Sequence, residues 1–261
     1  MTKYLIANDF KKMIKILLYI YPFAVFFGAV SWLVKLGENT VLQSVFYNVF
    51  ASLTYSAVAA ILVNMFLHIL RVFINNFYKD ECYLTHTLPV TKNQLLLSKY
   101  ISALAVVVTS IAVCAVSLFL VLNGAGFMEF MKSALQSGVG GFEMPVWQFL
   151  VTAAVLILLQ ICALISFAFT AVIKANMYNE KRAVKGLLWF ALFYFGAMAV
   201  TFIVALLVFA IRGNISELFS STISQDSLMT VFITAIVMYA IYTAVFFVLS
   251  KKLFNKGVNV D

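Results

Sequence analysis

Six long apolar runs, separated by short polar segments, dominate the 261-residue sequence. They lie at residues 16–34, 46–70, 100–122, 148–173, 186–211 and 228–249. Each run reaches the roughly 20 residues that an α-helix needs to cross a bilayer. None of the runs has a charged residue inside it. The pattern predicts an all-α membrane protein with six transmembrane helices, in which residues 16–261 form one transmembrane domain.

The first 15 residues follow another pattern, with apolar and charged side chains interleaved at helical spacing. The apolar positions are Leu5, Ile6, Phe10, Met13 and Ile14, and the polar positions are Lys3, Asn8, Asp9, Lys11, Lys12 and Lys15. A helix of this kind lies in the membrane interface, with its basic face toward the headgroups. We expect residues 1–15 to form an amphipathic interfacial helix; the alternative is a charged flank without structure of its own.

Basic residues are shared unevenly between the segments that join the runs. Fifteen Lys or Arg fall in the N-terminal stretch, the loops at 71–99 and 174–185, and the tail from Lys251. The other segments hold three, namely Lys35, Lys132 and Arg212, while the acidic residues divide five and five. Basic residues concentrate in cytoplasmic loops of membrane proteins. This bias predicts that both termini and the 71–99 loop are cytosolic.

The longest of the segments predicted to lie outside, residues 123–147, mixes glycines with large apolar side chains. Such a composition is compatible with a loop that dips into the outer leaflet. It is equally compatible with an irregular linker that shields the outer ends of the helices.

Composition supports a membrane protein and excludes several other classes. The chain is 64% hydrophobic and 11% charged, whereas soluble domains carry about 25% charged residues. The net charge of +8 falls in short blocks between apolar runs, which indicates contact with membrane lipid rather than with nucleic acid. The three cysteines, Cys82, Cys114 and Cys162, are scattered, so we expect no disulfide framework.

Catalytic and metal-binding patterns do not emerge from the sequence. His68 and His86 have no second ligand near them in the chain, and we expect them to be interfacial or packing residues. No stretch matches the GxxxxGK[ST] phosphate-binding loop, so hydrolysis of ATP by that route is not expected in this chain. The uncharged runs also argue against ion-coupled transport, which normally uses an intramembrane ionisable group. The chain is therefore not expected to be an enzyme, to bind a metal or to carry a cofactor of its own.

The loop between the second and third runs has the most informative sequence. Pro89 disfavours a helical conformation of the residue before it, so the chain is expected to bend there. Thr91 and Gln94 then have the spacing of a capping box, which predicts a new helix from Lys92 into the third run. Upstream, residues 79–87 have the spacing of a short helix. The loop is thus either a compact docking surface or an ordinary well-capped connection.

Residues 80–99 read D-E-x-Y-L-T-x-T-L-P-V-T-x-x-x-L-L-x-S-K. This run resembles the first cytosolic loop of small ABC-2 type permeases, the membrane subunits of bacterial ABC exporters. The six spans, the N-terminal interfacial helix and the cytosolic termini are similar to that family in layout. The resemblance implies that a coupling segment seats in a groove of the ATPase subunit, with the residues Asp80, Glu81, Tyr83, Leu84, Thr85, Leu88 and Pro89.

The resemblance also implies where the protein works and with what. The expected location is the bacterial cytoplasmic membrane, and the expected partners are an ABC ATPase subunit, which holds ATP and Mg, and a second permease copy, identical or related. Candidates for the polar lining of a pathway are Thr54, Tyr55, Ser56, Asn64, Gln160, Tyr194 and Thr201.

Weakly polar, aromatic and uncharged linings would suit an amphipathic or bulky cargo such as a peptide antibiotic, a drug or a lipid. One alternative is a self-sufficient secondary transporter or channel. Another is a non-transporting anchor, sensor or immunity subunit.

Overall fold

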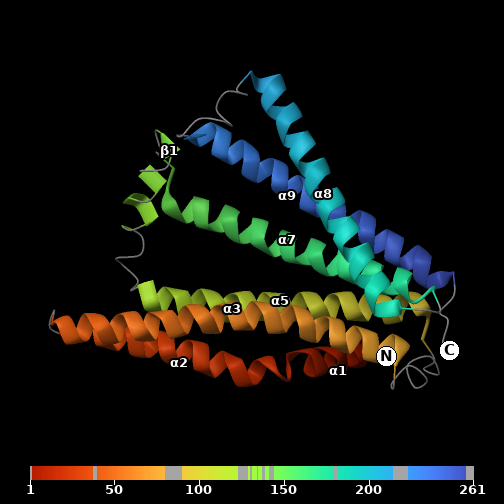
Figure 1. Ribbon diagram of the computed structural model, residues 1–261, viewed down its shortest axis with the longest axis horizontal. Coiled ribbons are helices and arrows are strands. Elements are labelled where there is room, and N and C mark those ends of the chain that lie inside the picture. Colours follow the sequence, from red (N-terminus) through yellow and green to blue (C-terminus); the bar gives the residue numbers. More distant parts are fainter. Residues whose placement is uncertain are drawn as a thin grey trace. The chain divides into compact units, whose positions relative to one another are not determined.

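The computed structural model describes residues 2–37, 40–79, 90–122, 129, 131–133, 135–136, 139–140, 144–178, 181–213 and 223–256. The main helices of these residues are α1 (Thr2–Ile14), α2 (Leu17–Lys35), α3 (Val41–Tyr78), α5 (Lys92–Leu122), α7 (Val146–Ala175), α8 (Arg182–Arg212) and α9 (Gln225–Asn255) (Figure 1). Two-residue strands, β1 (Val139–Gly140) and β2 (Ile223–Ser224), pair in parallel. The predicted all-α class is confirmed.

Six of the described helices, from α2 to α9, are long and apolar enough to cross a membrane, one for each predicted run. Most of these helices are longer than the apolar run that predicted them. The largest extension is in α3, which has 38 residues where the run has 25. At 1.5 Å per residue α3 is about 57 Å long, against about 30 Å for the hydrocarbon core. Helix α3 therefore has to project beyond the hydrocarbon of a membrane that it crosses.

The chain divides into two compact units, residues 1–129 and 130–261, which we call the N-terminal and C-terminal units. In the N-terminal unit α2 packs on α3 and α5, and α1 packs on α5 and α3. A row of small side chains along α5, including Ser102, Ser110 and Ser117, is fully buried. Small residues let helix backbones approach closely in membranes. The Tyr21 hydroxyl of α2 lies 2.7 Å from Ser110 Oγ and adds a polar link at this seam.

The closest approach of α2 to α5 is at Gly28. A Cβ atom built on Gly28 would lie 3.0 Å from the backbone oxygen of Ser117 and 3.4 Å from Leu120 Cβ. Since the nearer atom belongs to the backbone of a helix, it cannot move aside as a side chain would. The packing of α2 on α5 thus depends on the missing side chain at this position.

We expect Gly28→Val to lower the free energy of unfolding by about 1–3 kcal/mol, because the added carbons force the two helices apart. The measurement is SDS-induced unfolding in mixed micelles. The matched control is Gly196→Val in α8, where an added Cβ meets nothing within 4 Å. Equal losses in the two variants would mean that valine itself, and not the helix contact, is responsible.

The C-terminal unit is built on α7, which packs against α9 and α8. Its core contains Ala163, Phe167, Met238 and Tyr242. The ring of Phe246 meets that of Phe167 edge-on, with centroids 4.5 Å apart. Polar links cross the same contacts: Thr170 Oγ1 lies 2.7 Å from Ser250 Oγ, and the Tyr242 hydroxyl donates to Ala197 O over 3.0 Å. Helix α7 is thereby joined to α9, and α9 to α8.

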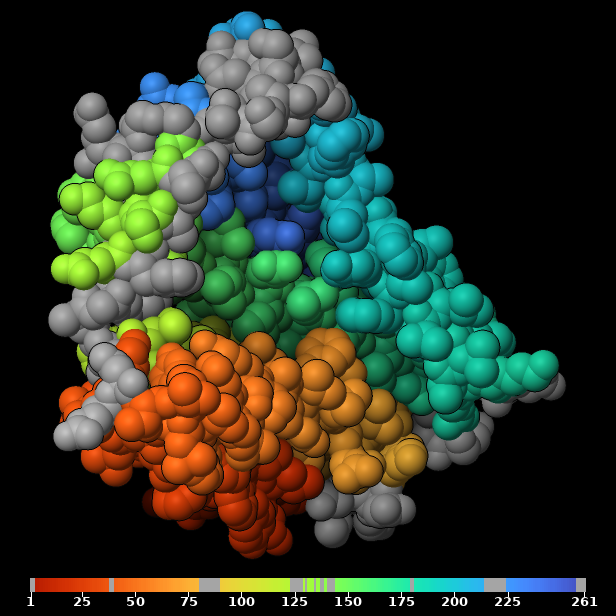
Figure 2. Space-filling model, turned by 60° about the vertical axis from the view of Figure 1, so that its left-hand side comes forward, coloured from red at the N-terminus to blue at the C-terminus, as the bar shows by residue number. Residues whose placement is uncertain are grey.

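Large apolar side chains of α8 point outward rather than into the C-terminal unit. Leu187, Leu188 and Phe195 are each exposed over more than 60% of their surface. Figure 2 shows the side chains of this helix (cyan) exposed along its length. Within this unit α8 therefore presents an apolar face, as a helix in contact with lipid does.

Candidate functional site

The predicted coupling segment, Asp80, Glu81, Tyr83, Leu84, Thr85, Leu88 and Pro89, lies outside the described residues. The same holds for nearly all of the short helix predicted at 79–87 and for His86. The two helix ends that flank this segment are described. Helix α3 ends at Tyr78 and α5 begins at Lys92.

The predicted capping box at the start of α5 is present. The backbone N–H of Gln94 donates to Thr91 Oγ1 over 3.3 Å, and the backbone N–H of Thr91 donates to Gln94 Oε1 over 3.1 Å. Each side chain thus satisfies a backbone donor that a helix N-terminus leaves unpaired. The predicted helix start at Lys92 is confirmed, and the helix continues into the third run without interruption.

Thr91→Ala is expected to weaken the first turn of α5 by about 1 kcal/mol. Local opening controls amide exchange. A loss of about 1 kcal/mol should therefore make hydrogen–deuterium exchange of residues 92–96 about fivefold faster. Lys92→Ala, at an exposed position that adds no bond to the box, should leave the exchange nearly unchanged. If Thr91→Ala exchanges at the wild-type rate, the box does not stabilise this helix end.

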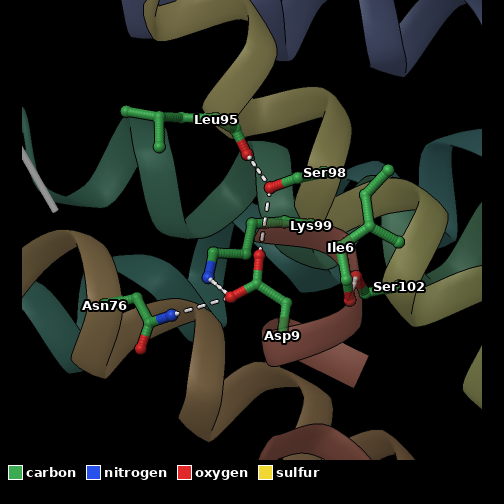
Figure 3. A network of polar contacts seen from close by, with 7 residues as sticks. All are labelled: Ile6, Asp9, Asn76, Leu95, Ser98, Lys99 and Ser102. Carbon is green, nitrogen blue, oxygen red and sulfur yellow. Dashed lines mark hydrogen bonds and ion pairs between the residues drawn. The ribbon is translucent and has the colours of Figure 1, made fainter. Parts of the chain in front are cut away.

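A buried ion pair between Asp9 of α1 and Lys99 of α5 is the centre of a polar cluster (Figure 3). The ammonium of Lys99 donates to Asp9 Oδ1. Ser98 Oγ shares its hydrogen between Asp9 Oδ2 at 3.0 Å and Leu95 O at 2.8 Å, and Asn76 Nδ2 of α3 donates to Oδ1 over 3.4 Å. Asp9 and Lys99 are each only 2% exposed. The cluster therefore joins three helices around one carboxylate.

The surroundings of this carboxylate make an unpaired charge there unfavourable. Phe73 and Phe77 are fully buried nearby, and the Lys99 ammonium lies 5.8 Å from the centre of the Phe77 ring. Removing an ion from water costs several kcal/mol unless a partner and hydrogen bonds compensate. Here Lys99 neutralises Asp9, and three donors reach its two oxygens. The pair is consistent with a charge held in a low-dielectric environment.

The backbone of α1 is fixed by two further contacts. Ser102 Oγ donates to Ile6 O over 3.0 Å, and His68 Nε2 donates to Lys12 O over 2.9 Å. Helix α1 is thus held by polar groups of α3 and α5 on both sides of Asp9. The contact to Lys12 agrees with the expectation that His68 is a packing residue.

One sequence-based interpretation is corrected by this cluster. The sequence pattern groups Asp9 with the polar face of the N-terminal helix, but Asp9 lies on the buried face together with Met13. Lys99 lies within α5, in the helix predicted to start at Lys92. The apolar runs themselves carry no charge, as the sequence indicates, yet an ionisable pair is buried beside the third one. The signal for this burial is helical register, since Leu5, Asp9 and Met13 are four residues apart.

The four pathway candidates of α3 are mostly occupied by bonds to their own helix. Thr54 donates to Phe50 O, Ser56 to Leu53 O and Asn64 to Ala60 O, each over 2.8 Å. Tyr55 is 46% exposed. Bonds of this kind satisfy a hydroxyl or an amide without a ligand.

The three candidates of the C-terminal unit gather at one pocket. Gln160, Tyr194 and Thr201 line a cavity of about 260 Å³ together with Leu164, Phe167, Ala197, Met198, Phe202, Ala205 and Tyr239. Figure 2 shows a recess here, between α7 (green) and α8 (cyan). None of these lining residues is charged. At this size the pocket could take part of a drug-sized molecule, because whole ligands need about 300–1,000 Å³.

Metal ligation has no support in the described part of the chain, where no group of three His, Cys, Asp or Glu side chains comes together. Cys114 and Cys162 are free thiols. No family model, curated protein or solved structure matches the chain. Any functional assignment therefore rests on the residues themselves.

Proposed function

We propose that this protein is the permease subunit of an ATP-driven exporter of the ABC-2 type, with ATP and Mg held by a separate ATPase subunit. The observation that carries the proposal is the sequence of residues 80–99. The capping box that starts α5 just after Pro89 supports it, because a fixed helix start defines where the proposed docking residues end. Six helices of spanning length supply the membrane part that such a subunit needs.

In this proposal both termini and the loop between α3 and α5 face the cytosol of a bacterium, and α1 lies at the inner interface. Support comes from the helix ends that carry the basic residues. Lys174, near the end of α7, lies 3.2 Å from the centre of the Trp189 ring, and Lys185 of α8 lies 4.4 Å from that of Tyr178. Basic and aromatic side chains together are typical of a membrane–water interface.

For the pathway we propose a second permease copy, identical or related, and an amphipathic or bulky cargo. The convergence of Gln160, Tyr194 and Thr201 on an uncharged, aromatic pocket supports a route for such a molecule through the C-terminal unit. Uncharged polar groups can orient a cargo without the desolvation cost that a buried charge carries.

The test of the ATPase partnership is the double charge reversal Asp80→Lys with Glu81→Lys. The tagged protein is co-expressed with a candidate ABC ATPase subunit, purified in mild detergent and assayed for bound ATPase. We expect loss of the ATPase with membrane insertion unchanged, since charge reversal in a docking segment opposes the complementary surface.

The matched control is Lys251→Glu with Lys252→Glu, which also reverses two charges; these two lysines are exposed and lie near the C-terminal end of α9. It should retain the ATPase. Intact complexes in the Asp80/Glu81 variant would show that this segment does not dock the ATPase, and the proposal would lose its main support.

The buried Asp9–Lys99 pair favours one other function, an ion-coupled transporter, because ionisable groups buried in membrane proteins commonly belong to ion pathways. Its location weakens that alternative. Lys99 lies about 10 Å from the start of the 31-residue helix α5, by the rise per residue. Flux driven by a proton gradient in liposomes containing this protein alone would establish the transporter, and would require the ATPase proposal to be abandoned.

A further inference from the structure

The Asp9 cluster joins the two helix ends that flank the proposed docking segment. Asn76 lies two residues before the end of α3, and Ser98 and Lys99 lie in the second turn of α5. Both groups donate to the same carboxylate of α1 (Figure 3). The cluster therefore bears directly on the spacing of the ends of α3 and α5.

We propose that Asp9 is a positioning residue, which acts through Lys99, Ser98 and Asn76 to fix the spacing of the ends of α3 and α5. The effect of this positioning role on ATPase docking rests on the function proposed above. The effect on helix spacing does not rest on that function, because all groups involved belong to this chain. Helix α1 then has a defined role as the element that ties the two ends together.

The carboxylate suits this role because of its directional bonds. Apolar contacts such as those of Phe73 and Phe77 are non-directional and allow helices to slide. Charge-assisted hydrogen bonds are shorter and roughly twice as strong as neutral ones, and they fix the partner atoms in space. Asp9 makes such bonds toward α5 and a longer bond toward α3. One side chain thus sets two helices relative to each other.

Removing the charges need not release α1 from the unit. The bonds from Ser102 to Ile6 O and from His68 to Lys12 O use the backbone of α1 and do not involve the Asp9 side chain. Met13 is also fully buried in the same face. A variant without the ion pair should therefore keep α1 docked and lose only the constraint on spacing.

The test is a pulsed EPR distance between spin labels on cysteines introduced at Lys79 and Lys92, both exposed and next to the two helix ends. Cys82, Cys114 and Cys162 are first replaced by serine or alanine in the full-length protein. The test variant combines Asp9→Asn with Lys99→Met, so that no unpaired charge is buried. We expect one narrow distance distribution in the parent and a width about twofold larger in this variant, once its charge-assisted bonds are gone.

Two further variants separate positioning from general stability. Ser110→Ala removes the Tyr21–Ser110 link in the same unit and should leave the distance distribution unchanged. Exchange of the charges, Asp9→Lys with Lys99→Asp, rebuilds an ion pair and should narrow the distribution again. A distribution in the neutral variant as narrow as in the parent, with a similar melting temperature, would overturn the proposal.

The consequence for docking is measured separately. With the ATPase present, the neutral variant should bind it about tenfold more weakly, because a docking segment free to move must be ordered on binding, and Ser110→Ala should bind normally. If the Asp80 and Glu81 reversal leaves the ATPase bound, the proposed function fails while the EPR result stands. An unchanged width of the EPR distance distribution in the neutral variant contradicts the positioning role whatever the ATPase does.

Discussion

Lys99→Met is expected to lower the free energy of unfolding by about 3–5 kcal/mol, which is the usual cost of removing one partner from a buried ion pair. The substitution leaves the Asp9 carboxylate 2% exposed without its cation. Asn76 and Ser98 still donate to it, but two neutral donors cannot balance the lost solvation of a charge. The loss is measured by SDS-induced unfolding in mixed micelles, followed by tryptophan fluorescence.

The double variant Asp9→Asn with Lys99→Met is expected to regain most of that loss, since neutral side chains of similar size often replace a buried pair with little effect on stability. Lys11→Met, on the exposed side of α1, should change stability by less than about 0.5 kcal/mol. If the double variant is as unstable as Lys99→Met, the loss comes from the packing of the lysine side chain and not from the unpaired charge.

The six spanning helices are predictable because hydropathy is a local property that each run carries by itself. Hydropathy does not predict the end of α3, since the apolar run stops at Leu70 while the helix continues to Tyr78. A signal for the extension is nevertheless present in the sequence. Ile69, Val72, Phe73, Asn76 and Phe77 are buried at helical spacing, so the period continues after the membrane-type composition has ended.

The polar cluster cannot be predicted in the same way. Asp9 and Lys99 are separated by 90 positions, and nothing local in either segment identifies the other. The start of α5 shows the contrast, because Thr91 and Gln94 form their bonds within one turn. A capping box is encoded locally, whereas an ion pair between helices depends on how the helices pack.

The pocket of the C-terminal unit is partly predictable from the sequence. Gln160, Tyr194 and Thr201 are candidates by residue type alone, and it is tertiary packing that places them around one cavity. Tyr239 of α9 lines the same cavity but is not among the sequence candidates, since residue type alone does not tell which of the tyrosines in the apolar runs face one another. Thr54 and Ser56 of α3 donate to backbone oxygens four and three residues earlier, which is common for Ser and Thr in helices.

Phe167→Ala is expected to lower the free energy of unfolding by about 3 kcal/mol, the lower end of the range for phenylalanine in a core. Phe167 is 2% exposed, and its ring contacts those of Phe246 and Tyr242, with centroids 4.5 and 6.0 Å away. The substitution opens a cavity where α7 meets α9 and enlarges the neighbouring pocket that Phe167 lines. The same unfolding assay in mixed micelles measures the effect.

The matched control is Phe195→Ala in α8, where the ring is 66% exposed. Lipid or detergent chains can fill the space left by an exposed ring, because they are as apolar as the side chain they replace. Phe167 instead packs against the rings of Phe246 and Tyr242, and these rings lose their dispersion contacts when the Phe167 ring is removed. A large loss for Phe167→Ala with almost none for Phe195→Ala is therefore the expected result. Equal losses would show that the exposed face of α8 is covered by protein rather than by lipid.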